Sequence, residues 1–105
     1  MIKIRLEDLE TQPTPLGGRS RFLVDNPDLR LVNLVLQPGE SVAPHTAPVK
    51  VVFLALEGRG RMVLEEKEVE ISAGELAVCP PGVDRAVRAE GGSGLSLLVI
   101  RCPNR

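Results

Sequence analysis

Few side chains in this 105-residue sequence can carry acid–base, nucleophilic or metal-binding chemistry. It has one histidine, His45, and two cysteines, Cys79 and Cys102, but no tyrosine or tryptophan. A single imidazole excludes a three-histidine metal site or a pair of imidazoles within one chain. Because Cys79 and Cys102 form neither a CxxC motif nor a disulfide framework, they are typical of reduced thiols, and we expect a cytoplasmic protein.

The composition excludes several classes of protein. With 43% hydrophobic residues, 26% charged residues and a net charge of −1, the chain fits one soluble domain. It has two aromatic residues and no basic excess, so we expect no nucleic-acid partner. No apolar run reaches the roughly 18 residues of a membrane span, so we expect no membrane partner. Arginine outnumbers lysine by ten to three and asparagine plus glutamine total five, which is typical of thermophiles but also of GC-rich genomes.

The elements that must position these side chains are short and β-like. Glycine and proline divide the chain into pieces, and no piece of 12 residues has a convincing helical period. About nine short strands separated by such turns predict an all-β sandwich or barrel, with residues 10–19 as a surface loop or arm. The expected strands are Lys3–Glu7, Arg21–Val24, Arg30–Leu36, Val49–Leu56, Arg61–Leu64, Val69–Ile71, Leu76–Cys79, Val83–Ala89 and Leu95–Arg101.

Two stretches have the spacing of a known pair of motifs. In the first, five residues separate Gly39 from His45 and six separate Val51 from Gly58. This segment resembles the first motif of the cupin superfamily, G-x5-H-x-H-x3,4-E-x6-G.

The segment from Gly74 to Ala89 resembles the second cupin motif, G-x5-P-x-G-x2-H-x3-N. Its glycines and proline are present as Gly74, Pro80 and Gly82. The resemblance implies a small single-domain cupin over residues 1–105, folded as a jelly-roll barrel, the double-stranded β-helix. The glycine and proline framework encodes turns, where positive φ and strand ends are needed, and does not encode chemistry.

Cupins generally hold a metal ion with three histidines and one glutamate. Carried over to this sequence, the first histidine is His45, whereas Ala47, Val51 and Arg85 stand at the second histidine, the glutamate and the third histidine. Alanine and valine donate nothing, and a guanidinium repels a cation. We therefore expect no metal site and no cofactor.

Arg85 and His45 are the main candidates for binding. If Arg85 points inward like the histidine it replaces, its charge needs an anionic partner. That partner is either an internal acid, such as Glu40, Glu57 or Asp84, or the carboxylate or phosphate of a ligand. Alternatively, Arg85 forms a structural salt bridge at the rim or extends into solvent. His45 is either a pocket base or hydrogen-bond donor, or a remnant of the framework that a backbone carbonyl satisfies or that lies exposed at the mouth.

Strand alternation predicts which neighbours of His45 line the barrel. The residues in phase with it are apolar, namely Ala47, Val49, Val51, Phe53 and Ala55. Cys79 precedes the Pro80–Gly82 corner, and we expect a small buried hydrophobe on the other face of its strand or at the rim. The candidate pocket residues are therefore His45, Arg85, Ala47, Val51, Phe53 and Cys79.

The opposite face of the same strand, with Val52, Leu54 and Leu56, is also apolar. A strand that is apolar on both faces is covered on both sides, either by an added segment or by a second chain. We expect a homodimer that forms by sheet packing.

Three classes of function remain. The first is a non-catalytic cupin without the metal site that binds a small anionic or apolar ligand in its barrel. The second is a cupin-type enzyme, an isomerase or dioxygenase, whose metal site is completed from elsewhere. The third is a purely structural or regulatory module. The missing ligands favour the first or third class, and these two differ in whether the barrel interior is open or filled.

Overall fold

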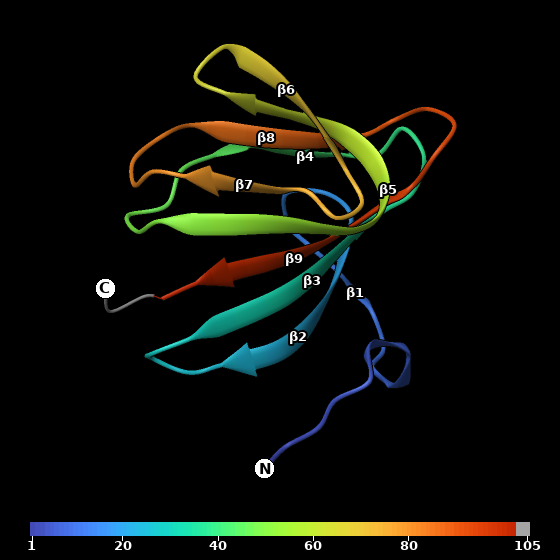
Figure 1. Cartoon of the computed structure of the whole chain (residues 1–105), viewed down its shortest axis with the longest axis vertical. Coiled ribbons are helices and arrows are strands. Elements are labelled where there is room, and N and C mark those ends of the chain that lie inside the picture. Colours follow the sequence, from blue (N-terminus) through green and yellow to red (C-terminus); the bar gives the residue numbers. More distant parts are fainter. Residues whose placement is uncertain (103–105) are drawn as a thin grey trace.

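A computed structural model describes residues 1–102, which are nearly all β. Every strand pairing is antiparallel, and the strands curl into a jelly-roll barrel (Figure 1). No helix in the described part of the chain is long and apolar enough to cross a membrane. The elements are η1 (Leu6–Asp8), β1 (Gln12–Pro13), β2 (Arg19–Asp25), β3 (Arg30–Leu36), β4 (Ser41–His45), β5 (Val51–Leu64), β6 (Lys67–Ser72), β7 (Leu76–Cys79), β8 (Arg85–Ala89) and β9 (Leu95–Arg101).

Strand β5 joins the two layers of the barrel. Its first half pairs with β7 and β9, and its second half pairs with β6 and β8. The main path through the sheet is β1-β2-β3-β9-β5-β8-β4. The prediction of two strands here, Val49–Leu56 and Arg61–Leu64, was wrong, because one strand of 14 residues runs through the expected turn.

Gly58 explains why this strand bends without ending. It has a φ of 77°, next to a register shift between Ala55 and Glu57. A Cβ at position 58 would lie 1.8 Å from the carbonyl oxygen of Gly94, so only glycine fits. The other three motif glycines also have positive φ, as the framework predicted: Gly39, Gly74 and Gly82.

The N-terminal part of the chain departs from the expected pattern. The predicted strand Lys3–Glu7 is wrong, since residues 3–5 have no regular secondary structure, Leu6 and Glu7 belong to η1, and none of them pairs with a strand in the described part of the chain. Strand β4 was not predicted, because Pro44 interrupts its sequence. It lies at a sheet edge and pairs with β8 across a register shift between Val42 and His45, where proline is tolerated. The loop in residues 10–19 contains β1 and is tied to β4 by a hydrogen bond from the Ala43 amide to the Leu16 carbonyl.

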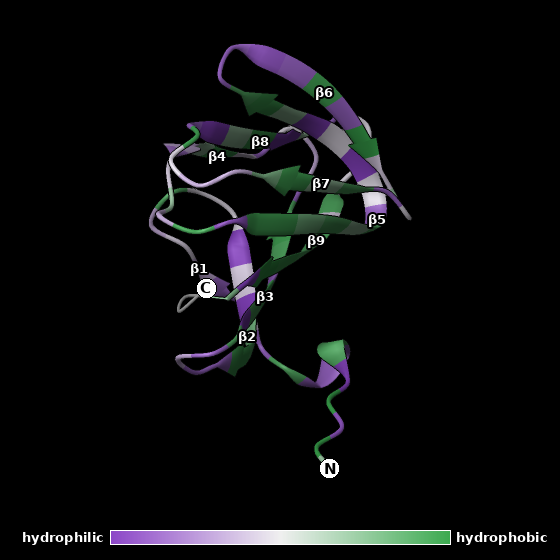
Figure 2. Cartoon of the chain, turned by 60° about the vertical axis from the view of Figure 1, so that its left-hand side comes forward, coloured by the Kyte–Doolittle hydropathy of each residue, from purple (hydrophilic) through white to green (hydrophobic). Residues whose placement is uncertain are grey.

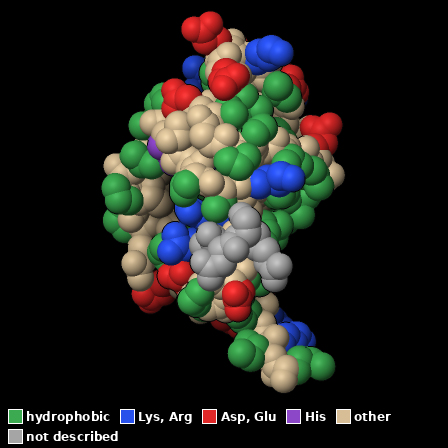
Figure 3. Space-filling view, turned by 90° about the vertical axis from the view of Figure 1, so that its left-hand side faces the viewer, with side chains coloured by type: hydrophobic (Ala, Val, Ile, Leu, Met, Phe, Trp, Pro, Cys, Tyr) green, Lys and Arg blue, Asp and Glu red, His purple; other side chains and the backbone are tan. Residues whose placement is uncertain are grey.

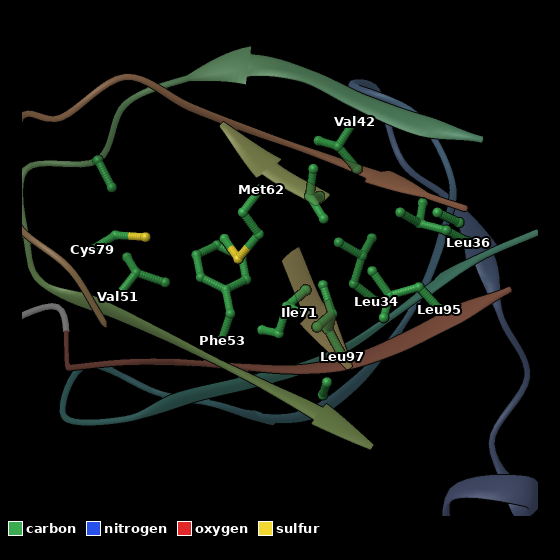
Figure 4. Close-up of a cluster of buried hydrophobic side chains, with 14 of the residues drawn as sticks. Leu34, Leu36, Val42, Val51, Phe53, Met62, Ile71, Cys79, Leu95 and Leu97 are labelled. Carbon is green, nitrogen blue, oxygen red and sulfur yellow. The ribbon is translucent and has the colours of Figure 1, made fainter. Parts of the chain in front are cut away.

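The core runs along the barrel, from Val51 and Cys79 at the end where β9 stops to Leu36 and Leu95 at the other end (Figure 4). Leu36, Met62, Leu95 and Leu97 are fully buried within it. The five residues predicted to face inward are all buried: Ala47, Val49, Val51, Phe53 and Ala55. The alternation holds on β5 for Val51, Phe53 and Ala55, but it does not continue from His45, because His45 ends β4 and residues 46–50 connect the two strands.

The outer face of the β5–β7–β9 layer is also apolar. In Figure 2 the first half of β5 and the whole of β7 are hydrophobic, and β9 is hydrophobic apart from Ser96 and Arg101. Val52 and Leu54 are half-buried, and their cross-strand neighbours Val78 and Leu76 are 49% and 59% exposed. Within this chain, the described residues leave that pair open to solvent.

Candidate functional site

A cavity of about 240 Å³ opens at the end of the barrel where β4 and β9 end and β8 begins. The β3–β9–β5 layer forms its floor, with Arg30, Arg101 and Val51 in one cross-strand row. The opposite layer contributes His45 and Arg85, which are direct partners on β4 and β8. Figure 3 looks onto this end of the barrel and shows basic side chains beside hydrophobic ones.

Arg85 points into this cavity and is only 5% exposed. One guanidinium nitrogen, Nη2, lies 3.3 Å from Nε2 of His45, and the guanidinium carbon lies 5.5 Å from the centre of the Phe53 ring. Within the described part of the chain, the buried Nε has no hydrogen-bond partner. The side chain is therefore held by a histidine and an aromatic face, and its charge is not neutralised by either.

The structure excludes the internal acids considered as partners of Arg85. Glu40, Glu57 and Asp84 are all exposed. Among residues 1–102, the ion pairs within 4.0 Å join Arg30 to Asp25 and Arg61 to two glutamates, and none includes Arg85. The expectation of a side chain extended into solvent was also wrong, because Arg85 is 5% exposed, and no carboxylate of residues 1–102 forms the rim salt bridge that was the other alternative.

Burial changes the ionisation of two neighbouring groups. It lowers the pKa of the Arg85 guanidinium, and the positive charge of Arg101 adds to this lowering, whereas Cys79 opposes it. Burial also raises the pKa of the Cys79 thiol, against the opposing charge of Arg85. An arginine remains charged at neutral pH in spite of such a shift, and a thiol with a raised pKa remains protonated. Cys79 is therefore an unreactive thiol next to a fixed cation.

His45 is half-buried at the mouth, and both of its ring nitrogens have partners. Its Nδ1 lies 3.2 Å from the carbonyl oxygen of Ala43, and its Nε2 faces Arg85. Since a guanidinium only donates hydrogen bonds, Nε2 accepts one and Nδ1–H donates to the carbonyl. This arrangement combines the backbone contact expected of a framework remnant with a position in the pocket.

Arg101 is a functional candidate that the sequence analysis missed. It lies at the end of β9, directly opposite Arg30 on one side and Val51 on the other. Its Nε is buried without a hydrogen-bond partner among residues 1–102, whereas Nε of Arg30 lies 3.1 Å from the Asp25 carboxylate. The mouth therefore carries three guanidinium groups, of which Arg30 alone is paired with a carboxylate of the described residues.

The family model of the cupin domain matches residues 32–101 of this chain. The chain belongs to the cupin family. Among curated proteins, none matches it in sequence. The protein TT1209 from Thermus thermophilus has a similar structure, with 26% identity over 98% of both chains and a TM-score of 0.84.

Two further solved structures share the fold of this cupin at lower identity. The polyketide cyclase RemF from Streptomyces resistomycificus is 21% identical over 98% of this chain and 80% of its own, with a TM-score of 0.88. A predicted oxalate decarboxylase from Thermotoga maritima is 19% identical over 96% of this chain and 98% of its own, with a TM-score of 0.86. These similarities support the fold of the barrel, and fold alone does not determine chemistry.

The residues at the cupin metal-ligand positions do not fit a divalent cation. Ala47 and Val51 are buried and offer no donor atom, and Nε2 of His45, the nitrogen facing the cavity, meets Arg85. Across the part of the chain that the structure describes, no group of three or more His, Cys, Asp or Glu side chains lies close enough to hold a metal ion.

The six predicted pocket residues fall into two groups. His45, Val51, Phe53 and Arg85 line the cavity, whereas Ala47 and Cys79 are buried without lining it. The expectation that Cys79 lies on the outer face or at the rim was wrong. It is 0% exposed and sits beside Val51 on the inner face, while its sequence neighbour Val78 points outward.

Several lining residues were not predicted. They come from the loop before β2 and from β3 and β9, and include Thr14, Pro15, Leu16, Arg30, Val32, Val99 and Arg101. For Arg101 a signal was available. Leu95, Leu97, Val99 and Arg101 alternate in phase, so a buried face of β9 continues directly onto a charged residue.

Proposed function

We propose that this cupin binds a small organic anion in its barrel and does not catalyse a reaction. The observation that carries this proposal is Arg85, a 5% exposed guanidinium whose Nε has no partner and whose charge meets no carboxylate of residues 1–102. A buried charge without a counter-charge costs stability, and a buried donor without an acceptor costs about 1–3 kcal/mol. An anionic ligand would supply both missing partners.

The cavity favours a binding protein over a purely structural module. Apolar side chains such as Val51 and Phe53 form its walls, yet they leave about 240 Å³ open. That space corresponds to about eight water molecules at their volume in the liquid, so the ligand is small. A filled barrel would have favoured the structural module.

The chemistry of the mouth favours binding over catalysis. His45 is the only imidazole, and its two nitrogens contact Arg85 and the Ala43 carbonyl, so no free base faces the cavity. A cupin-type isomerase or dioxygenase would need metal donors from another chain, because Ala47 and Val51 provide none.

Calorimetric titration tests the proposal with two probes, hexanoate and inorganic phosphate. We expect at least one of them to bind the wild-type protein with 1:1 stoichiometry, and Arg85→Gln to weaken that binding by about 10-fold or more. Arg88→Gln is the matched control, because Arg88 lies on the same strand, is exposed, and carries the same charge. The proposal would be refuted if neither anion bound the wild type. It would also be refuted if the wild type and Arg85→Gln bound the anion equally tightly.

Metal analysis provides an independent test. Protein purified without a histidine tag should contain less than about a tenth of an equivalent of any transition metal, because the ligand positions offer one imidazole. Metal near one equivalent per chain would favour the enzyme alternative, with donors completed from another chain.

We also propose that the chain forms a homodimer through the outer face of the β5–β7–β9 layer. The face carries Val52, Leu54, Leu76 and Val78 and no charged side chain among them, so two identical copies can meet there without like charges opposing each other. Light scattering should give twice the chain mass of 11.3 kDa. Val78→Glu should yield a monomer.

Val69→Glu is the control for this dimer. Val69 is 46% exposed, close to the 49% of Val78, but lies on β6 in the other layer. A monomeric wild-type protein, or dissociation by both variants alike, would contradict an interface on this face.

A further inference from the structure

We infer that Arg101 is the second arm of a carboxylate clamp, and that the ligand class is a small carboxylic acid with an apolar body. The carboxylate would lie at the mouth between Arg85 and Arg101, and the apolar body would extend into the barrel. This inference rests on the proposed anion binding and adds to it a second binding residue, the chemical class of the ligand and its orientation.

The position of Arg101 brings to the cavity of Arg85 a second cation that is not paired with a carboxylate of residues 1–102. The two come from opposite layers, on β9 and β8, and both line the cavity. They are close enough for the charge of Arg101 to affect the pKa of Arg85. Both have a buried Nε without a hydrogen-bond partner among the described residues, so each offers an N–H donor to a shared acceptor. Guanidinium groups bind carboxylates in a bidentate manner, which suits a clamp from two sides.

The cross-strand pairing makes this arrangement costly without an anion. Arg30 and Arg101 stand directly opposite each other on β3 and β9, and like charges in such a pair are destabilising. Asp25 neutralises Arg30 at 3.1 Å. No carboxylate of residues 1–102 lies within 4.0 Å of Arg101, so one acceptor placed between Arg85 and Arg101 would relieve both cations.

The depth of the cavity determines what else the ligand must carry. One row further into the barrel, the cross-strand neighbours are Phe53, Val99 and Val32, all of which line the cavity. Beyond them, Leu34 and Val42 continue the apolar wall. The hydroxyl of Ser20, opposite Leu34, also lines the cavity at this depth. A charged group there would lose its hydration and meet this one neutral hydroxyl, whereas an alkyl or aryl group would bury apolar surface.

This polarity separates a carboxylic acid with an apolar body from a free inorganic anion. Phosphate would satisfy the two guanidiniums and leave the apolar part of the cavity unused. A neutral amide with the same body would fill the apolar part and leave both cations without a counter-charge. An acid with one carboxylate and a short apolar body satisfies both regions.

Calorimetric titration with hexanoate, hexanamide and inorganic phosphate tests the assignment. For the wild type we expect hexanoate to bind at least about 10-fold more tightly than either of the other two. Arg101→Gln should weaken hexanoate binding by about 10-fold or more and leave the weak binding of hexanamide unchanged. Arg101→Lys should recover part of the loss, because it keeps the charge and loses the fork of donors. Arg88→Gln again serves as the control.

The possible failures are distinguishable. If hexanoate binds and depends on Arg85 but binds Arg101→Gln as tightly as the wild type, the second arm is refuted and the proposed anion binding stands. If phosphate binds as tightly as hexanoate, the apolar body is refuted and the anion site again stands. If neither anion binds, both proposals fail. Circular dichroism melting of each variant confirms that a loss of binding is not a loss of folding.

Discussion

Replacing Arg85 with methionine should stabilise the ligand-free protein. A buried residue kept for packing generally loses stability when it is changed, whereas a residue kept for binding at a cost to the fold gains stability. Methionine retains a long flexible side chain of similar reach and removes the charge. The substitution therefore separates a structural role of Arg85 from a binding role.

The expected magnitude follows from the contacts of Arg85. Removing the guanidinium loses the contact with His45 Nε2, worth about 0.5–1.5 kcal/mol, and the interaction with the Phe53 ring, worth about 0.5–2 kcal/mol. It removes the desolvation penalty of a buried ion, which is several kcal/mol and includes the cost of the unsatisfied Nε donor. It also removes the repulsion from Arg101. The free energy of unfolding should therefore rise by about 1–3 kcal/mol.

Urea denaturation of the wild type, Arg85→Met and Arg88→Met measures this effect. A gain of about 1 kcal/mol corresponds to a rise in Tm of about 4 °C for a domain of this size. Arg88 is exposed, so its substitution should change the free energy by no more than about 0.5 kcal/mol. If Arg85→Met instead lowers the free energy of unfolding by more than about 1 kcal/mol while Arg88→Met does not, Arg85 is a structural residue and the argument for an anion site loses its basis.

Three further predictions follow from single residues. Cys102 is half-buried and should react with Ellman's reagent in the native protein. Cys79 should react only on unfolding, because it is buried and burial raises its pKa. Equal reaction rates of the two thiols in the native protein would contradict the inward orientation of Cys79. Gly58→Ala should prevent folding or lower the free energy of unfolding by more than about 3 kcal/mol, since its Cβ would clash with a carbonyl oxygen. Gly74 has a φ of 88° and open space around it, so Gly74→Ala should cost about 1–2 kcal/mol. Similar losses of stability for the two variants in thermal melts would refute this prediction. Side-chain and backbone hydrogen bonds lower the pKa of Glu75 in the folded state, so its contribution to stability is present above the ordinary value of 4.5 and is lost as the pH falls through the lowered pKa. Glu75→Gln should reduce the slope of stability against pH in acid, and an unchanged slope would be inconsistent with that contribution.

The fold could be predicted because its signals are local. Gly39, Gly74 and Gly82 need positive φ at turns, and that requirement is legible from residue type and spacing. The alternation of Val51, Phe53 and Ala55 likewise assigns the inner face of β5 without knowledge of the partner strands. Gly58 was predicted to end a strand, because in the sequence a glycine that bends a continuous strand looks the same as a glycine in a turn between two strands. What requires glycine in the bend is the carbonyl of Gly94, a residue far along the chain.

The site was predicted only in part because it depends on which strands meet. His45 and Arg85 were accessible through their motif positions, but Arg101 joins them through the β9–β5 and β9–β3 registers, which no local pattern specifies. Cys79 was placed on the wrong face for a related reason. Its strand has four residues, all apolar, so the sequence contains no polar alternation from which to read the orientation.

Arg85 stands where the family resemblance places a histidine, and this difference bears on the proposed function. In the arrangement implied by the family resemblance, a histidine at position 85 would help to hold a cation, and that cation would attract an anionic group. Arg85 supplies a fixed positive charge from the protein itself, while Ala47 and Val51, at two of the other ligand positions, are buried and have no donor atom. A guanidinium attracts and orients a carboxylate as a cation does, but it cannot lower the pKa of a bound water molecule to generate a nucleophile. On the proposed function, the same position therefore retains the attraction for an anion without the means to transform it, and a second arginine, Arg101, adds the geometric selectivity that coordination bonds would otherwise provide.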